Sequence, residues 1–135
     1  MNKVIVAIGS NYDSGPRIEA AKKSLQRLIY NAGFTPEKET APIGVSMPCA
    51  NYTNLLAYGY TDISIDSLRE HLKDIEKACG DKREERRKGK VAMDLDILLY
   101  GNNRHHDADW QRDYIKEMIH SIHHFLQDEN NIKQQ

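Results

Sequence analysis

Apolar residues recur along this chain with two different periods, and the period changes several times from end to end. Short β-branched or alternating runs predict strands, whereas apolar positions three and four residues apart predict helices with one buried face. Glycine, proline and serine mark most boundaries between these segments. The expected strands span residues 3–8, 34–40, 52–61 and 93–99, and the expected helices run from Ser14 towards Gly33, from Ser64 to Gly80, and from Trp110 to Gln127.

The order of the elements is strand, helix, two strands, helix, strand and a final helix. It predicts an α+β fold, a ferredoxin-like βαββαβ sandwich with an added C-terminal helix. The chain contains no internal repeat, no low-complexity stretch and no change of composition that would mark a linker. We therefore expect one domain over residues 1–127 and a frayed tail over residues 128–135.

Composition argues against several classes of protein. The formal net charge of −1 at pH 7 gives no overall basic field, so no nucleic-acid partner is expected. No apolar run is long enough to cross a membrane, and the N-terminal residues show no signal-peptide pattern. Cys49 and Cys79 form neither a disulfide framework nor a metal-binding spacing. We expect a monomer in the reducing cytoplasm that acts on small molecules.

Candidate chemistry begins with two aspartates on the strand 93–99. Residues i and i+2 of a strand share one face about 6–7 Å apart, so Asp94 and Asp96 point the same way, beside Leu98 and Tyr100. The residues expected on the other face are Leu95, Ile97 and Leu99. Two carboxylates on one half-buried face repel each other, and Mg²⁺ would relieve that repulsion with ligands of the type it prefers. The alternative is that both carboxylates pair with nearby arginines.

A run of basic residues, 81–90, precedes this strand. Its cations are Lys82, Arg83, Arg86, Arg87, Lys88 and Lys90. One interpretation is a mobile loop that closes over phosphates, for which the planar fork of arginine is suited. The other is a solvated continuation of the preceding helix, which composition alone favours. Cations next to a carboxylate pair are typical of phosphoryl transfer.

Several segments together resemble one known family. They are Ala7–Asn11, Thr40–Gly44, Asn51–Asn54, Ile75 and Glu76 followed by Gly80, and Asp94–Gly101. In this order and spacing they resemble 6-hydroxymethyl-7,8-dihydropterin pyrophosphokinase, an enzyme family of folate synthesis, over roughly residues 3–101. The resemblance implies a ferredoxin-like fold and transfer of the β,γ-diphosphate of ATP to the hydroxymethyl oxygen of the pterin.

The resemblance also assigns expected roles to individual residues. Asp94 and Asp96 would bind two Mg²⁺ ions, and Arg83 and Arg87 would act as catalytic cations. The residues expected to bind the pterin are Thr40, Pro42, Ile43, Tyr52 and Asn54, with Tyr52 stacked on the ring and Asn54 hydrogen-bonded to its edge. The residues expected to face the nucleotide are Glu76, Arg83 and Lys88.

The chain departs from the family pattern in two places. Val91 stands where the family has an arginine before its aspartates, and Asp81 lies near the position of another loop arginine. After Gly101 the family has a proline–histidine segment and an aromatic residue; Trp110, Tyr114 or one of the paired histidines His105 and His106 would have to replace them. The alternative function is therefore a non-catalytic or altered-specificity relative that binds a nucleotide, a pterin or a protein partner.

Overall fold

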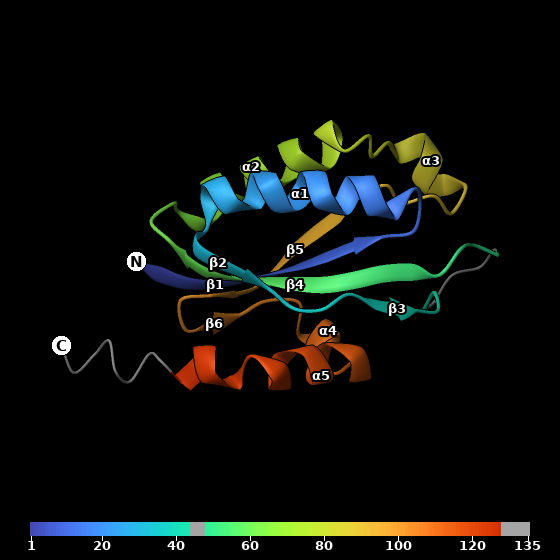
Figure 1. Cartoon of the computed structure of the whole chain (residues 1–135). Helices are drawn as coiled ribbons and strands as arrows, with labels where there is room; N and C mark the ends of the chain where they lie inside the picture. Colours follow the sequence, from blue (N-terminus) through green and yellow to red (C-terminus); the bar gives the residue numbers. More distant parts are fainter. Residues whose placement is uncertain (44–47, 128–135) are drawn as a thin grey trace.

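An antiparallel sheet forms the middle layer of this computed structural model, which describes residues 1–43 and 48–127 (Figure 1). Within these residues the strands are β1 (Asn2–Ser10), β2 (Tyr30–Phe34), β3 (Lys38–Thr40), β4 (Tyr52–Thr61), β5 (Asp94–Tyr100) and β6 (Asn103–Arg104). The helices are α1 (Ser14–Leu28), α2 (Ile65–Ala78), α3 (Arg83–Arg87), α4 (Asp107–Trp110) and α5 (Asp113–Ser121). Figure 1 shows α1, α2 and α3 on one face of the sheet and α4 and α5 on the other.

The sheet has the strand order β2-β4-β1-β5-β6, and β3 pairs with the N-terminal end of β4. All recorded pairings are antiparallel. The two strand–helix–strand units, β1-α1-β2 and β4-α2-β5, interleave so that β1 lies between β4 and β5, which is the ferredoxin-like arrangement. The predicted α+β fold and the added C-terminal helix are therefore confirmed.

Helices on both faces explain why β1 reads as a continuous apolar run. Val4, Val6 and Ile8 pack in the core between the sheet and helices α1 and α2. Ile5 points the other way and packs with residues of α5, such as Ile115 and Met118. A strand covered on both faces needs no polar alternation. Strand β1 therefore contributes side chains to the hydrophobic cores on both faces of the sheet.

The second expected strand begins earlier than predicted and is divided. Helix α1 ends at Leu28, so the prediction that Gly33 terminates it was wrong. Gly33 instead lies within β2, where a built β-carbon would lie 2.5–2.7 Å from atoms of the Tyr58 ring. The close approach of two strands, not a helix end, requires glycine there. The chain leaves the sheet around Pro36, which has no amide to donate to a ladder, and pairs again as β3.

The final helix also differs from the predicted span 110–127. Arg112 adopts an extended backbone with ψ 137°, which separates α4 from α5, and a further helical stretch covers residues 123–127. Trp110 anchors α4 because its indole Nε1 donates to the carbonyls of Leu98 and His105, at 3.1 and 3.0 Å. The short strand β6 before α4 was not predicted. The expected frayed tail 128–135 lies outside the described residues.

Helix α2 has the predicted boundaries. The Ser64 hydroxyl accepts a hydrogen bond from the amide of Ser67, and Gly80 with φ 89° turns the chain after the last helical residues. The charged run then forms the separate short helix α3. The charged run is therefore not a continuation of α2, because the turn at Gly80 separates the two helices. Among the described residues, no helix is both long and apolar enough to cross a membrane.

Candidate active site

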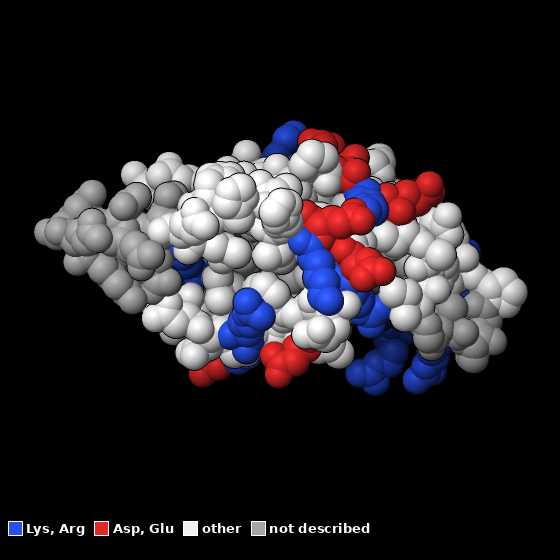
Figure 2. Space-filling model, turned by 90° about the horizontal axis from the view of Figure 1, so that it is seen from below, with Lys and Arg blue, Asp and Glu red and all other residues white. Residues whose placement is uncertain are grey.

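A cavity of about 210 Å³ opens on the face of the sheet that carries α5. Strands β1, β4 and β5 form its floor, residues 40–43 form one side, and α5 with the preceding turn forms the other. Figure 2 shows this face, where acidic and basic side chains gather side by side near the middle. Its lining includes both aspartates of β5.

The register of three strands aligns residues that are distant in sequence. Gly9 of β1 lies opposite Asn54 of β4 on one side and opposite Asp94 of β5 on the other. A β-carbon built on Gly9 would lie 3.2 Å from Asn54 Oδ1, a tight contact. Glycine therefore keeps the space between the amide and the carboxylate open.

Four residues form one side of the cavity, which we call the cradle: Thr40, Ile43, Tyr52 and Asn54. Asn54 Nδ2 donates a 2.6 Å hydrogen bond to Thr40 Oγ1, and Tyr52 lies opposite Thr40 in the ladder between β3 and β4. Burial raises the pKa of Tyr52, and the charges of Cys49 and Asp94 add to the increase. The cradle thus offers an aromatic face next to a fixed amide. Pro42, also expected here, is not among the described lining residues.

Asp94 and Asp96 both line the cavity, as their spacing predicts. Burial and the negative charge of Asp94 together raise the pKa of Asp96 to about 7, although the charge of His106 opposes the increase. His106 Nε2 lies 3.9 Å from Asp96 Oδ1. The two carboxylates therefore repel each other strongly enough to favour a proton or a cation.

The carboxylate pair suits Mg²⁺. In the part of the chain that the structure describes, no group of three or more His, Cys, Asp or Glu residues could hold a metal ion. A closed zinc or calcium site built from these residues would need more ligands. Mg²⁺ is commonly bound by one or two carboxylates and completes its shell with water and substrate phosphates. The donor set thus fits a metal that arrives with a phosphorylated substrate.

The other side-chain positions of β5 do not alternate throughout. The pairing of β1 with β5 shifts register between Ile5 and Val6, which places an extra residue on β5. As a result, Leu98 and Leu99 both pack on the α5 side, and Tyr100 packs against the opposite core. The predicted faces of Leu99 and Tyr100 were therefore wrong. The two aspartates precede the bulge and keep the expected orientation.

The charged run presents one arginine to the aspartates. Arg86 Nη2 lies 3.4 Å from Asp94 Oδ1 and donates to the Met93 carbonyl at 3.0 Å, and its Nε donates to Asp81 Oδ2 at 2.6 Å. Burial lowers the pKa of Arg86, but the hydrogen bond to Asp81 and the charge of Asp94 outweigh it, so the net change is upward. The cations expected to act here, Arg83, Arg87 and Lys88, are exposed and do not line the cavity as far as the chain is described.

Glu76 lies at a second cavity, also of about 210 Å³, between α2 and β5. Its Oε2 accepts a 2.8 Å hydrogen bond from the amide of Leu95. Burial raises the pKa of Glu76; the Leu95 hydrogen bond opposes this, and the charge of Asp94 adds to it. Asp96 lines both cavities, and His106 lines the second. The two cavities therefore share Asp96 in their linings.

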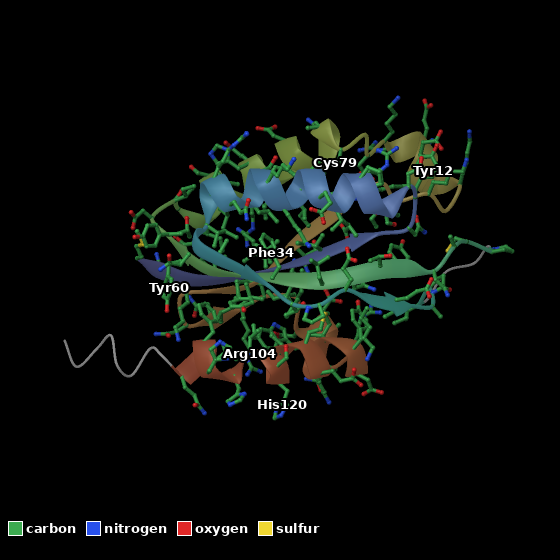
Figure 3. All side chains as sticks on the ribbon, viewed as in Figure 1. Tyr12, Phe34, Tyr60, Cys79, Arg104 and His120 are labelled. Atoms are coloured by element: carbon green, nitrogen blue, oxygen red, sulfur yellow. The ribbon has the colours of Figure 1, made fainter. Side chains whose placement is uncertain are left out.

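Sequence reasoning did not assign the residues that α4, α5 and the turn between them contribute. Tyr114, Arg112 and Asp109 line the first cavity opposite the cradle, with Arg112 Nε 3.2 Å from Asp109 Oδ1. Tyr114 and Trp110 were equal candidates for an aromatic at the site, and the structure separates them, because Trp110 is buried beneath Arg104. Figure 3 shows Arg104 on this side of the sheet. The irregular turn at residues 111 and 112 gave no periodic signal.

Comparison with known proteins adds to this geometry. The model of the 7,8-dihydro-6-hydroxymethylpterin-pyrophosphokinase family matches residues 5–124. Two relatives from Arabidopsis thaliana, "Folate synthesis bifunctional protein" and "Folate synthesis bifunctional protein, mitochondrial", are each 30% identical to this chain, over 126 and 127 residues respectively. Each match covers 84% of this chain but only 25% and 22% of the relatives, so the chain spans about a quarter of their length. The chain belongs to the 7,8-dihydro-6-hydroxymethylpterin-pyrophosphokinase family.

Proposed function

We propose that this chain transfers the β,γ-diphosphate of Mg-ATP to the hydroxymethyl group of 6-hydroxymethyl-7,8-dihydropterin, a step of folate biosynthesis. The observation that carries the proposal is the row of Asn54, Gly9 and Asp94 across three neighbouring strands. It joins a hydrogen-bonding cradle to a carboxylate pair in one cavity. Membership of the family and the names of the two relatives support the same reaction.

The cradle would bind the pterin. Asn54, held by its hydrogen bond to Thr40, would bond to the polar edge of the ring, and Tyr52 would stack on its face. Thr40, Pro42 and Ile43 would supply the remaining contacts from the loop. A fixed orientation of the acceptor matters because catalysis of phosphoryl transfer depends mainly on positioning the reactants and stabilising charge.

Asp94 and Asp96 would hold two Mg²⁺ ions, which neutralise phosphate charge and orient the attacking hydroxyl when they are bound. The nucleotide would lie along the second cavity beside Glu76, with Arg83, Arg87 and Lys88 as the cations of the charged run. The hydroxymethyl oxygen forms a bond to the β-phosphorus, the bond from that phosphorus to the α,β-bridging oxygen breaks, AMP leaves, and the hydroxyl proton is released to solvent.

A second candidate is a non-catalytic or altered-specificity relative that binds a nucleotide, a pterin or a protein partner. It is favoured by Val91, which is only 9% exposed and stands where the family has an arginine. The amide of Val91 is held by Asn11 Oδ1 at 2.6 Å. A buried, apolar side chain at this position contributes no charge to the phosphates.

Release of AMP from ATP in the presence of Mg²⁺, with and without the hydroxymethyl dihydropterin, separates the two candidates. Pterin-dependent AMP release supports catalysis. No release at saturating substrates contradicts it, and calorimetric binding of pterin or of an ATP analogue under the same conditions then favours the binding protein. A loss of pterin binding with intact Mg-ATP binding points to another acceptor.

A cytoplasmic location and a monomeric state also belong to this proposal. Cys49 and Cys79 are both free thiols, which is usual for proteins of a reducing compartment. Light scattering after size-exclusion chromatography tests the monomer, since a mass near 31 kDa, about twice the 15.5 kDa of the chain, contradicts it.

A further inference from the structure

Arg86 is the basic side chain of the run 81–90 that the structure turns towards the carboxylate pair. It belongs to α3, and within the described residues it makes the recorded ion pair with Asp94, at 3.4 Å. Its side chain is 37% exposed, so an anion bound beside Asp94 has access to the guanidinium. The neighbours Arg83 and Arg87 lie on exposed positions of the same helix.

Other cations of the run 81–90 are held elsewhere. Lys90 Nζ lies 5.2 Å from the centroid of the Tyr12 ring and 3.9 Å from Glu85 Oε2. Figure 3 shows Tyr12 at the end of the molecule that carries α3. Lys88 is paired with the same glutamate at 3.9 Å, and Val91 is buried. Within the run 81–90, Arg86 is thus best placed to supply the positive charge that Val91 does not.

The guanidinium of Arg86 still has donors to offer. Nε and Nη2 are engaged with Asp81, Met93 and Asp94, whereas Nη1 makes no hydrogen bond to any residue that the structure describes. An arginine with one edge fixed and the other open can bind phosphate oxygens with its fork. This open edge belongs to a guanidinium whose Nη2 lies 3.4 Å from Asp94 Oδ1, so it is close to the carboxylate that would hold a phosphate-bound cation.

We propose that Arg86 binds the transferred phosphates of the nucleotide and takes the part that an arginine at position 91 would otherwise have. This inference rests on the proposed function. On binding, Arg86 exchanges its contact with Asp94 for phosphate oxygens and keeps its hydrogen bond to Asp81. Arg83 and Arg87 then add charge from outside the cavity.

Asp81 positions Arg86. Its side chain is 12% exposed, Oδ2 accepts the bond from Nε, and its backbone amide donates to the Glu76 carbonyl at 3.0 Å. Oδ1 is buried and has no hydrogen-bond partner among the described residues. The carboxylate can therefore accept a second bond as the guanidinium turns. Asp81, which lies near the position of a family arginine, would therefore orient the Arg86 side chain.

The test is calorimetric binding of α,β-methylene ATP, which cannot be cleaved between the α- and β-phosphates, in the presence of Mg²⁺. The variants are Arg86→Gln, Arg86→Lys and Asp81→Asn, and the matched control is Arg27→Gln, which removes a distant arginine of α1. Circular dichroism melting checks that each variant folds. Arg86→Lys keeps the positive charge and loses the fork, so it separates charge from geometry.

We expect Arg86→Gln to weaken binding about tenfold to a hundredfold, Arg86→Lys to weaken it less, and Asp81→Asn to weaken it least, with Arg27→Gln unchanged. Equal affinity of wild type and folded Arg86→Gln or Arg86→Lys overturns the role of Arg86 and leaves the proposed function standing. A loss confined to Arg83→Gln or Arg87→Gln overturns it in favour of those residues. A wild type that binds no Mg-nucleotide overturns both proposals.

Discussion

The cradle and the charged run 81–90 meet at Asp94, yet they are built in different ways. Three of the four cradle residues, Thr40, Tyr52 and Asn54, lie on paired strands, and Asn54 donates a direct hydrogen bond to Thr40. Most cations of the charged run are exposed on a short helix, and Arg86 alone of its arginines reaches Asp94 within the described chain. The side proposed to bind the acceptor is therefore organised before a substrate arrives, whereas the side proposed to bind the phosphates depends on how one helix is turned.

This difference has a mechanical consequence. Asn54 lies on β4 between β1 and β3, so ladder bonds on both sides restrict its movement. Helix α3 has five residues, too few to be stable by itself, and it depends on contacts at its ends. One such contact is Asn11, which is 8% exposed and donates to the carbonyls of Ala50, before β4, and of Gly89, after α3.

The largest effect is expected at the junction of the two regions. Asp94→Ala removes a proposed metal ligand, and turnover should fall by about a thousandfold or more, because metal stabilisation of phosphate charge is worth several kcal/mol. Asp74→Ala removes an exposed carboxylate of α2 and serves as the control. The measurements are pterin-dependent AMP release and Mg-nucleotide affinity. Unchanged turnover in folded Asp94→Ala would rule out the metal role.

A second variant tests whether Asn11 joins the two regions. Asn11 Nδ2 donates to the Gly89 carbonyl at 2.8 Å, and Oδ1 accepts from Val91, so Asn11→Ala leaves a buried amide unpaired. The free energy of unfolding should fall by about 1–3 kcal/mol, measured by urea denaturation.

The same variant has a local readout. Hydrogen exchange at the Val91 amide should accelerate more than exchange at β1 amides. Asn11→Asp keeps the acceptor for Val91 and loses the donor to Gly89, so it should show part of the effect. The exposed Asn51→Ala provides the control. Equal exchange at the Val91 amide in wild type, Asn11→Ala and Asn11→Asp would contradict a connecting role.

A third variant probes the cradle by itself. Asn54→Ala removes the amide that Thr40 accepts from, and pterin affinity should fall about tenfold, while Mg-nucleotide affinity should stay the same. Thr53→Ala changes the neighbouring residue, whose side chain points to the other face of β4. Calorimetry with each ligand separately gives both affinities. A matching loss for the nucleotide would mean that the two regions are not independent.

The smallest effect concerns Glu76 and pH. Its raised pKa means that the folded chain binds a proton at Glu76 more tightly than the unfolded chain, so ionisation costs stability as the pH rises above the ordinary value of 4.5. Glu76→Gln keeps an acceptor for the Leu95 amide and cannot ionise. Its stability relative to wild type should rise with pH and level off above the pKa of Glu76.

Urea denaturation between about pH 4 and about pH 8 measures this difference. The control is Glu70→Gln, at an exposed position of the same helix. A difference between Glu76→Gln and wild type that does not change with pH would show that the carboxyl is not held in a destabilising environment.

Much of the fold was predictable because it depends on residues close together in sequence. The strand β4 has its predicted bounds, Ser64 caps α2, and Gly80 ends it. The shared face of Asp94 and Asp96 follows from the two-residue period of a strand. The resemblance also listed four cradle residues that line one cavity, although their binding roles stay predictions.

Contacts between distant segments decided the rest. The sequence by itself determined the order of the elements and the carboxylate pair, since both follow from local periodicity. Only the tertiary structure decided that Gly33 serves the packing of Tyr58, that Tyr114 and not Trp110 lines the cavity, and that Arg86 faces Asp94. The physical reason is that the rotation of a short helix and the register of remote strands are set by long-range packing, which a local pattern does not record.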